Sequence, residues 1–154
     1  MKTSRMSARV RYADTDRMGT VYHARYFEWF ELGRSQYLRD VGLPYAELEG
    51  KGVFLPVIEA SCRYLASPGY DDVLTIETTL DLPLRPRCVF RYRLLDADAS
   101  TELANGWTAH ALVNARRKPI RPPQWLSQAI SAATAGDWAV PRLDEQAPDK
   151  SRKG

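Results

Sequence analysis

Cysteine and histidine are scarce in this chain, and long apolar runs are absent from it. The 154 residues include two cysteines, Cys62 and Cys88, and two histidines, His23 and His110, none of them at zinc-ligand spacing. We therefore expect no metal site, and free thiols in a reducing cytoplasm. No run approaches the 18 apolar residues of a membrane span. Residues 1–10 lack the apolar core of a signal peptide, so we expect a cytoplasmic protein with no transmembrane segment.

A strong excess of one charge is also missing. The chain has 22 Lys and Arg against 19 Asp and Glu, a formal net charge of +3. Non-specific nucleic-acid binders usually cluster their basic residues and carry a larger excess, so no nucleic-acid partner is predicted. A phosphate-bearing small molecule suits this charge better, and nothing in the sequence calls for a cofactor.

The hydrophobic pattern predicts one α+β domain over residues 1–135, followed by a loose, Pro- and charge-rich tail over 136–154. A long helix from about His23 to Val41 is apolar around most of its circumference, which is typical of a helix wrapped by protein. A first strand is expected over Met6–Tyr12 after a frayed start, and a short helical turn over Tyr45–Glu49. Four further strands and a last helix are expected at Phe54–Leu65, Asp72–Leu82, Cys88–Leu95, Glu102–Arg116 and Gln124–Ala133.

This order fits one antiparallel sheet of about five strands, joined sequentially and wrapped around the long central helix. Apolar residues alternate along the later strands, at Leu74, Ile76, Thr78 and Leu80, at Cys88, Phe90, Tyr92 and Leu94, and at Leu103, Trp107, Ala109 and Ala111. Such a sheet leaves its edges uncovered, so we expect at least a homodimer, and more specifically a homotetramer.

The loop before the long helix carries the most suggestive chemistry. Asp14 and Asp16 are followed by Gly19 and then by His23 at the expected start of the helix. A nucleophilic-serine motif, a P-loop and a zinc-protease motif are all absent. Free N–H groups at a helix start can hold a developing oxyanion, and a nearby carboxylate can attack a carbonyl or activate water. The same aspartates could equally be loop and capping residues, and His23 a packing residue.

The residues from Arg11 to Tyr26 resemble the signature of the hotdog-fold acyl-CoA thioesterases. The family pattern is D-x-D-x-x-G-x-V-[YW]-[HFY]-x-x-Y, followed on the helix by E-x-x-R, here Glu31 and Arg34. The resemblance covers about residues 5 to 130 and is closest to the branch of 4-hydroxybenzoyl-CoA thioesterase and the Tol-Pal-associated (YbgC-like) thioesterase. Further matching segments are Gly42-Leu43-Pro44, Pro56-Val57-Ile58-Glu59 and Tyr64-Leu65-Ala66-Ser67-Pro68.

The resemblance implies hydrolysis of an acyl-CoA thioester to a free acid and CoA. Asp16 matches the family's catalytic carboxylate, as nucleophile or general base, and the backbone N–H of His23 matches the donor that polarises the carbonyl. Gly19 matches the glycine that lets substrate approach. The side chains of Tyr22 and His23 would line the acyl pocket or position water, and Val21 and Tyr26 fall in the same substrate-binding segment.

Three arginines are candidates for the CoA phosphates. Arg87 precedes one strand, and Arg116 and Arg117 close the last one. Solvated strand ends are the alternative interpretation of these side chains. Two other functions stay open: a non-catalytic acyl-CoA or acyl-carrier binding module on the same fold, and a thioesterase acting on carrier-protein-bound acyl chains.

Overall fold

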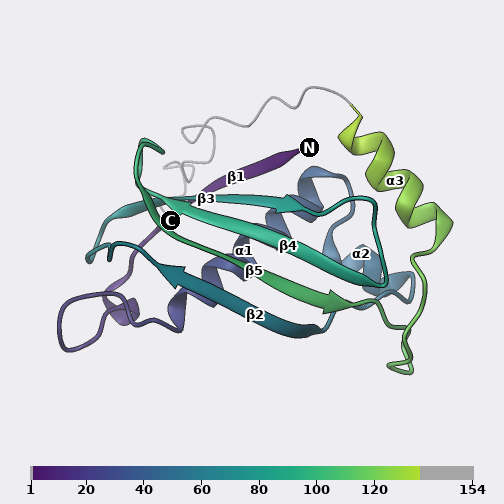
Figure 1. Cartoon of the computed structure of the whole chain (residues 1–154), viewed down its shortest axis with the longest axis horizontal. Helices are drawn as coiled ribbons and strands as arrows, with labels where there is room; N and C mark the ends of the chain where they lie inside the picture. The colour runs from purple at the N-terminus through teal and green to yellow at the C-terminus, as the bar shows by residue number, and fades with distance from the viewer. Residues whose placement is uncertain (1, 136–154) are drawn as a thin grey trace, which may run out of the picture.

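The computed structural model describes residues 2–135 of the chain. The predicted tail over 136–154 lies outside these described residues. Within these residues, five strands, three helices and one short 3-10 turn follow one another (Figure 1). In order they are β1 (Thr3–Arg9), η1 (Tyr12–Asp14), α1 (Arg25–Asp40), α2 (Tyr45–Gly50), β2 (Val57–Tyr64), β3 (Val73–Leu80), β4 (Arg87–Leu95), β5 (Glu102–Ala111) and α3 (Gln124–Thr134).

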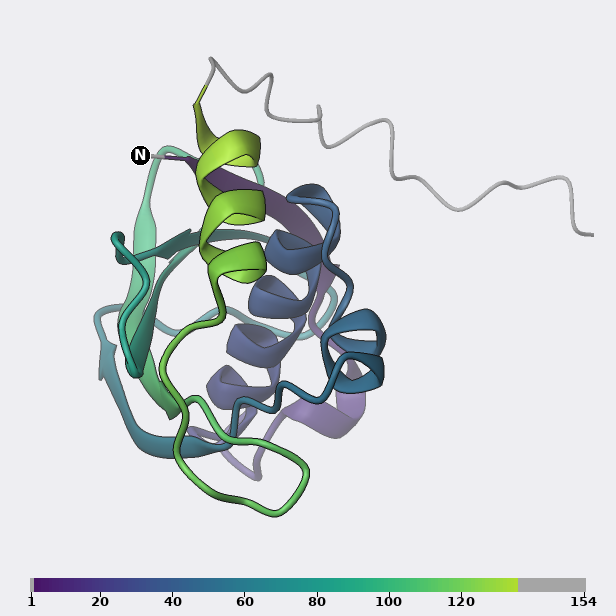
Figure 2. The ribbon, with the colours of Figure 1, turned by 90° about the vertical axis from the view of Figure 1, so that its right-hand side faces the viewer.

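The strands form one antiparallel sheet in the order β1-β3-β4-β5-β2. The sheet curls around α1, which contacts β1, β3 and β4, and α3 lies at one end of the sheet (Figures 1 and 2). Lys2 donates a hydrogen bond to the carbonyl of Ala133, which links the start of the chain to the end of α3. The expected hotdog architecture, a five-stranded antiparallel sheet around one long helix, is confirmed.

Two glycines let the helix and the sheet approach closely. A Cβ at Gly33 of α1 would lie 2.4 Å from Oγ1 of Thr78 on β3. A Cβ at Gly106 of β5 would lie 2.2 Å from a backbone oxygen of β2 and 2.7 Å from the ring of Phe30. That ring is stacked on Tyr92 of β4 at 4.4 Å, so the core is tightest where α1 crosses the middle of the sheet.

Several predicted boundaries are corrected. β1 begins at Thr3, in the stretch expected to fray, because its polar residues pair with β3 all the way to Thr79. Tyr12, expected in that strand, lies in η1 instead. Helix α1 begins at Arg25 and not at His23, because the carbonyl of His23 accepts the hydroxyl of Tyr64 while the N–H of Phe27 bonds to Ala24. The last strand ends at Ala111, well before Arg116.

The prediction that the strands are joined sequentially is wrong for β2. β2 pairs with β5 and occupies an edge of the sheet, while β3 crosses to lie between β1 and β4. Burial agrees with this order, because most residues of the edge strand β2 are exposed whereas β3 is buried along nearly its whole length. On β5 the residues that face α1 are the small and polar ones, Gly106, Thr108 and His110, so the apolar series with Trp107 lies on the other face.

Candidate active site

The loop between η1 and α1 is folded back on itself as a short irregular hairpin. Thr15 and Val21 form an antiparallel bridge, and the N–H of Asp16 donates to the carbonyl of Thr20 at 2.8 Å. Gly19, at the tip, has φ of +76°, a left-handed conformation that glycine adopts at little cost. The chain reversal therefore places Asp16 opposite Thr20, a few residues before α1 begins.

Asp14 is the buried anchor of this loop. Its side chain is 2% exposed and forms an ion pair with Arg11 at 2.9 Å, and Nε of Arg25 lies 3.9 Å away. Burial opposes the charged form, but the hydrogen bonds from Arg11 and the charges of both arginines outweigh it and lower the pKa of Asp14. A carboxylate occupied by two arginines and shielded from solvent is suited to holding the loop together.

Asp16 is the exposed carboxylate of the loop. Its Oδ1 accepts the N–H of Met18 at 2.8 Å and the N–H of Thr20 at 3.3 Å, so backbone hydrogen bonds orient the side chain. It lies at an open depression of about 500 Å³ that Tyr12, Tyr22 and Arg25 also line. The carboxylate that the resemblance favours is thus the one that solvent and substrate can reach.

The backbone at His23, next to Tyr22 of this depression, offers a hydrogen-bond donor. Tyr22 donates its N–H to Asp14, and its carbonyl accepts the N–H of Arg25, which starts α1. Among the described residues the N–H of His23 has no acceptor. An N–H group left free beside a helix start is available to a carbonyl oxygen.

The other predicted residues of this segment divide into exposed and buried ones. Gly19, Tyr22 and His23 are exposed, and the rings of Tyr22 and His23 lie 4.6 Å apart. Val21 and Tyr26 are 6% and 2% exposed and belong to the hydrophobic core. The last two therefore support the loop from beneath in the single chain.

The three arginines predicted to bind phosphate do not lie with Asp16. Arg87 and Arg117 are near the end of the sheet where β4 starts and β5 finishes, and Arg116 is beside them. The loop of Asp16 is at the other end, where β2 finishes (Figure 1). Arg87 donates to Glu59 at 2.8 Å, and Arg116 and Arg117 lie in a turn whose backbone is bonded to Asn114. Within one chain, these side chains and Asp16 are not brought together.

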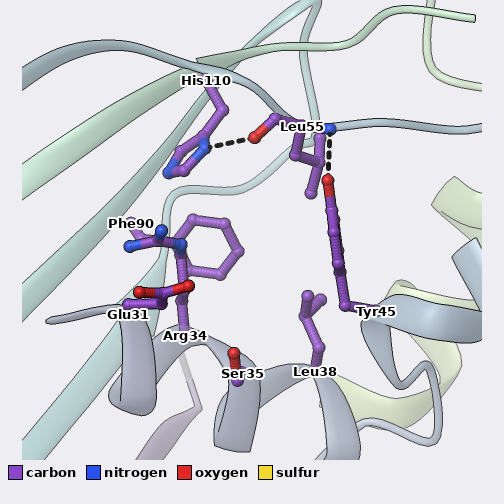
Figure 3. A pocket seen from close by; sticks show the side chains of 8 residues that line it. All are labelled: Glu31, Arg34, Ser35, Leu38, Tyr45, Leu55, Phe90 and His110. Atoms are coloured by element: carbon purple, nitrogen blue, oxygen red, sulfur yellow. Dashed lines mark hydrogen bonds between the residues drawn. The ribbon is translucent and has the colours of Figure 1, made fainter. Parts of the chain in front are cut away.

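A second cavity, of about 180 Å³, lies between α1 and the sheet, and its residues were not predicted as a site. Figure 3 shows Glu31 and Arg34 of α1 on one side of it and His110 of β5 on the other. His110 donates from Nδ1 to the carbonyl of Leu55 at 2.9 Å, so in the neutral ring Nε2 accepts from Thr108. His110 stood out in the sequence only as a polar residue among small ones.

The hydrogen bonds of His110 continue across the sheet. Thr108 is also bonded to the hydroxyl of Tyr92, at 2.6 Å. Burial lowers the pKa of His110, the bond to Leu55 opposes this, and the positive charge of Arg34 adds to the lowering. The neutral imidazole is therefore the form that this buried network accommodates.

In the part of the chain from 2 to 135, no group of three or more His, Cys, Asp or Glu side chains is arranged to hold a metal ion. Over the same residues, none of the helices combines the length and apolar character needed to cross a bilayer.

Comparison with known proteins gives consistent family matches. Residues 10–130 match the family model of the thioesterase-like superfamily. The chain is 38% identical to YneP of Bacillus subtilis over 81 residues. The aligned segment covers 53% of this chain and 59% of YneP. It is 33% identical over 94 residues to the acyl-CoA thioester hydrolase YbgC of Escherichia coli O6:H1, covering 61% of this chain and 70% of that one.

Structural comparison extends the match over almost the whole fold. The DHNA-CoA thioesterase of Staphylococcus aureus superimposes with a TM-score of 0.78 at 31% identity, covering 88% of this chain and 93% of that one. The family model includes the loop of Asp16, helix α1 and strands β2 to β5. The five-stranded sheet, the loop before α1 and these matches together show that the chain belongs to the thioesterase-like superfamily of hotdog proteins.

Proposed function

We propose that this protein hydrolyses acyl-CoA thioesters to a free acid and CoA. The observation that carries the proposal is the exposed carboxylate of Asp16, which shares its loop with the free N–H of His23. The relatives named as acyl-CoA thioester hydrolases support the substrate class. A module that only binds acyl-CoA has no need of a carboxylate beside the thioester carbonyl.

The proposed chemistry uses groups that the loop already holds in place. The N–H of His23 polarises the thioester carbonyl, and Gly19 leaves room for the approach of the substrate. Asp16 either attacks the carbonyl carbon, forming an anhydride that water then opens, or removes a proton from an attacking water. In both cases water is added across the C–S bond, and CoA leaves as the thiol.

The proposed assembly is at least a homodimer. β2 is an edge strand, and Val57, Ile58, Tyr64 and the following Leu65 are each 44–52% exposed. An exposed apolar edge strand favours pairing with another chain. Antiparallel pairing of two copies of β2 would extend the sheet across both subunits, and a homotetramer would join two such pairs.

This dimer would also complete the active site. The two-fold axis of an antiparallel pair reverses the partner's sheet end to end. The end of the partner's sheet that carries its candidate phosphate-binding arginines then lies beside the end of this sheet that carries Asp16. Arg87 of the partner subunit, and the partner's Arg116 and Arg117, would then lie on the same side of the dimer as this depression. In one chain the three arginines lie far from Asp16. This arrangement fits a CoA site shared between two subunits, in which the partner's arginines bind the CoA phosphates.

A hydrolysis panel tests the proposal. Short-chain, long-chain and aromatic acyl-CoAs are incubated with the full chain, and release of free thiol is followed. We expect at least one class to be hydrolysed with kcat/KM above about 10⁴ M⁻¹s⁻¹, the lower end for evolved enzymes. The same acyl groups on an acyl-carrier protein form the second arm of the panel.

The outcomes separate the candidate functions. Turnover of acyl-CoA supports the proposal, whereas turnover of the carrier-bound chains alone would reassign the substrate. Tight binding of acyl-CoA with no thiol release would identify a binding module. The oligomeric state is measured by light scattering at micromolar concentration, and a stable, active monomer would overturn the proposed assembly.

A further inference from the structure

Tyr64, the last residue of β2, connects the edge of the sheet to the segment that precedes α1. Its hydroxyl donates to the carbonyl oxygen of His23 at 2.9 Å. Its ring packs edge-on against the buried ring of Tyr26, with centroids 4.7 Å apart and planes at 85°. Tyr64 therefore has a fixed ring and a hydroxyl aimed at the backbone of the candidate carbonyl donor.

The carbonyl of His23 receives its hydrogen bond from Tyr64 and not from the helix. In a regular helix it would accept the N–H of Phe27, but that N–H is bonded to the carbonyl of Ala24 at 3.3 Å. Among residues 2–135, the hydroxyl of Tyr64 is the donor that the structure gives to the His23 carbonyl. The helix begins irregularly here, and a side chain of the sheet holds the peptide that helical bonding leaves free.

The two backbone groups of His23 are linked through a single Cα. On the N-terminal side, the carbonyl of Tyr22, which shares a peptide plane with the N–H of His23, accepts the N–H of Arg25 at 2.9 Å, and on the C-terminal side Tyr64 fixes the carbonyl of His23. The N–H of His23 lies between these two anchors, so its direction follows from both. Burial raises the pKa of Tyr64 to about 12, so the hydroxyl keeps its proton throughout the usual assay range.

We propose that Tyr64 is a positioning residue, which aims the N–H of His23 at the thioester carbonyl by holding the carbonyl of the same residue. The inference rests on the proposed thioesterase function and adds to it a residue of the sheet edge, outside the loop. Tyr64 itself makes no contact with the reacting atoms in this role. Its effect falls on the transition state, because the polarising bond strengthens as charge develops on the oxygen.

Tyr64→Phe tests the inference, because it keeps the ring against Tyr26 and removes only the hydroxyl. Loss of a complete oxyanion donor typically costs 10²–10³-fold in kcat. A donor that is kept but misdirected should cost less, and we expect kcat to fall about 10-fold while KM changes less than about 2-fold. Tyr45→Phe is the matched control, since the Tyr45 hydroxyl accepts the N–H of Leu55 at 3.2 Å, away from the loop. It should leave kcat unchanged.

An infrared measurement tests the positioning role of Tyr64 without relying on turnover. In an Asp16→Asn background, the infrared carbonyl stretch of a bound aromatic acyl-CoA reports polarisation by the N–H of His23. Adding Tyr64→Phe should move the stretch to higher frequency, and adding Tyr45→Phe should not.

The results distinguish failure of the inference from failure of the proposed function. If Asp16→Asn abolishes turnover but Tyr64→Phe changes neither kcat nor the carbonyl frequency, the positioning role of Tyr64 is wrong and the function stands. If Asp16→Asn retains full kcat, the proposed mechanism fails, and the inference fails with it.

Discussion

Replacing Asp14 by Asn should destabilise the protein and leave its chemistry intact, although Asp14 is two residues from the proposed catalytic carboxylate. The Asp14 side chain is 2% exposed, accepts the backbone N–H of Arg11 at 2.8 Å and is paired with the side chains of Arg11 and Arg25. Asn keeps the size and one acceptor oxygen, but it loses the charge and turns an NH₂ group toward two cations.

The magnitude follows from the exposure of the partners. The side chain of Arg11 is 66% exposed, so water screens that pair and its Coulomb attraction contributes little. The cost falls on the buried carboxylate, which loses the charge that strengthens its hydrogen bonds, and this is worth about 2 kcal/mol. Such a loss corresponds to a Tm lower by about 7 °C for a domain of this size.

The pH dependence of the same variant has a defined sign. The pKa of Asp14 is lowered in the folded protein, so its charge stabilises the fold above the ordinary pKa of about 3.9. This contribution is lost as the pH falls through that range toward the folded pKa. The difference in stability between wild type and Asp14→Asn should therefore be full at pH 7 and should shrink below about pH 4.

Thermal unfolding followed by circular dichroism measures the stability, and thiol release at 25 °C measures the activity. The control is Asp16→Asn, which should lie within about 0.5 kcal/mol of wild type because Asp16 is exposed and Asn keeps an oxygen for the same backbone donors. If Asp14→Asn were as stable as wild type but inactive, Asp14 would be the catalytic carboxylate and the assignment of the two aspartates would be reversed.

Three further predictions concern the core, the buried histidine and the CoA end. Gly106→Ala should destabilise the fold by about 2 kcal/mol or more in urea unfolding, because the new Cβ meets the backbone of β2 and the ring of Phe30; an unchanged midpoint would show that β2 can move away. Because the folded pKa of His110 is lowered, wild type should lose stability as the pH falls through about 6.5, whereas His110→Gln should lose less over the same range; parallel stability profiles would contradict this. Changing Arg116 and Arg117 to Gln should raise KM more than it lowers kcat, and added salt should mimic the change; an unchanged KM would remove both from the CoA site.

The helix and the strands were predictable because their signals are local. The apolar circumference of α1 and the alternation in β3 and β4 reflect burial within each element, so no knowledge of distant contacts was needed. The helix start shifted by two residues because a tertiary bond, from the hydroxyl of Tyr64 to the carbonyl of His23, takes the place of the first helical bond. Local helix propensity cannot predict such a tertiary hydrogen bond.

The arrangement of the site was less predictable than its composition. The sequence identified Asp16, Gly19 and His23 through a motif, yet it could not place Arg87 at the far end of the sheet, because strand order depends on the pairing of β2 with β5. The inward face of β5 was also hidden, since the ring of Phe30 requires a glycine there and His110 is satisfied by a polar network. Hydrophobic alternation points to the opposite face in such a strand.

The measurement that tests the central claim most directly is the kcat of Asp16→Asn on the best acyl-CoA of the panel, compared with wild type. The substitution keeps the side-chain shape and an oxygen for the N–H of Met18, but it removes the negative charge and the proton acceptor. Loss of a base or nucleophile is typically worth about 10²–10⁴-fold, so kcat should fall at least about 100-fold with a modest change in KM and an unchanged Tm. Hydrolysis by Asp16→Asn at near wild-type kcat would contradict the mechanism.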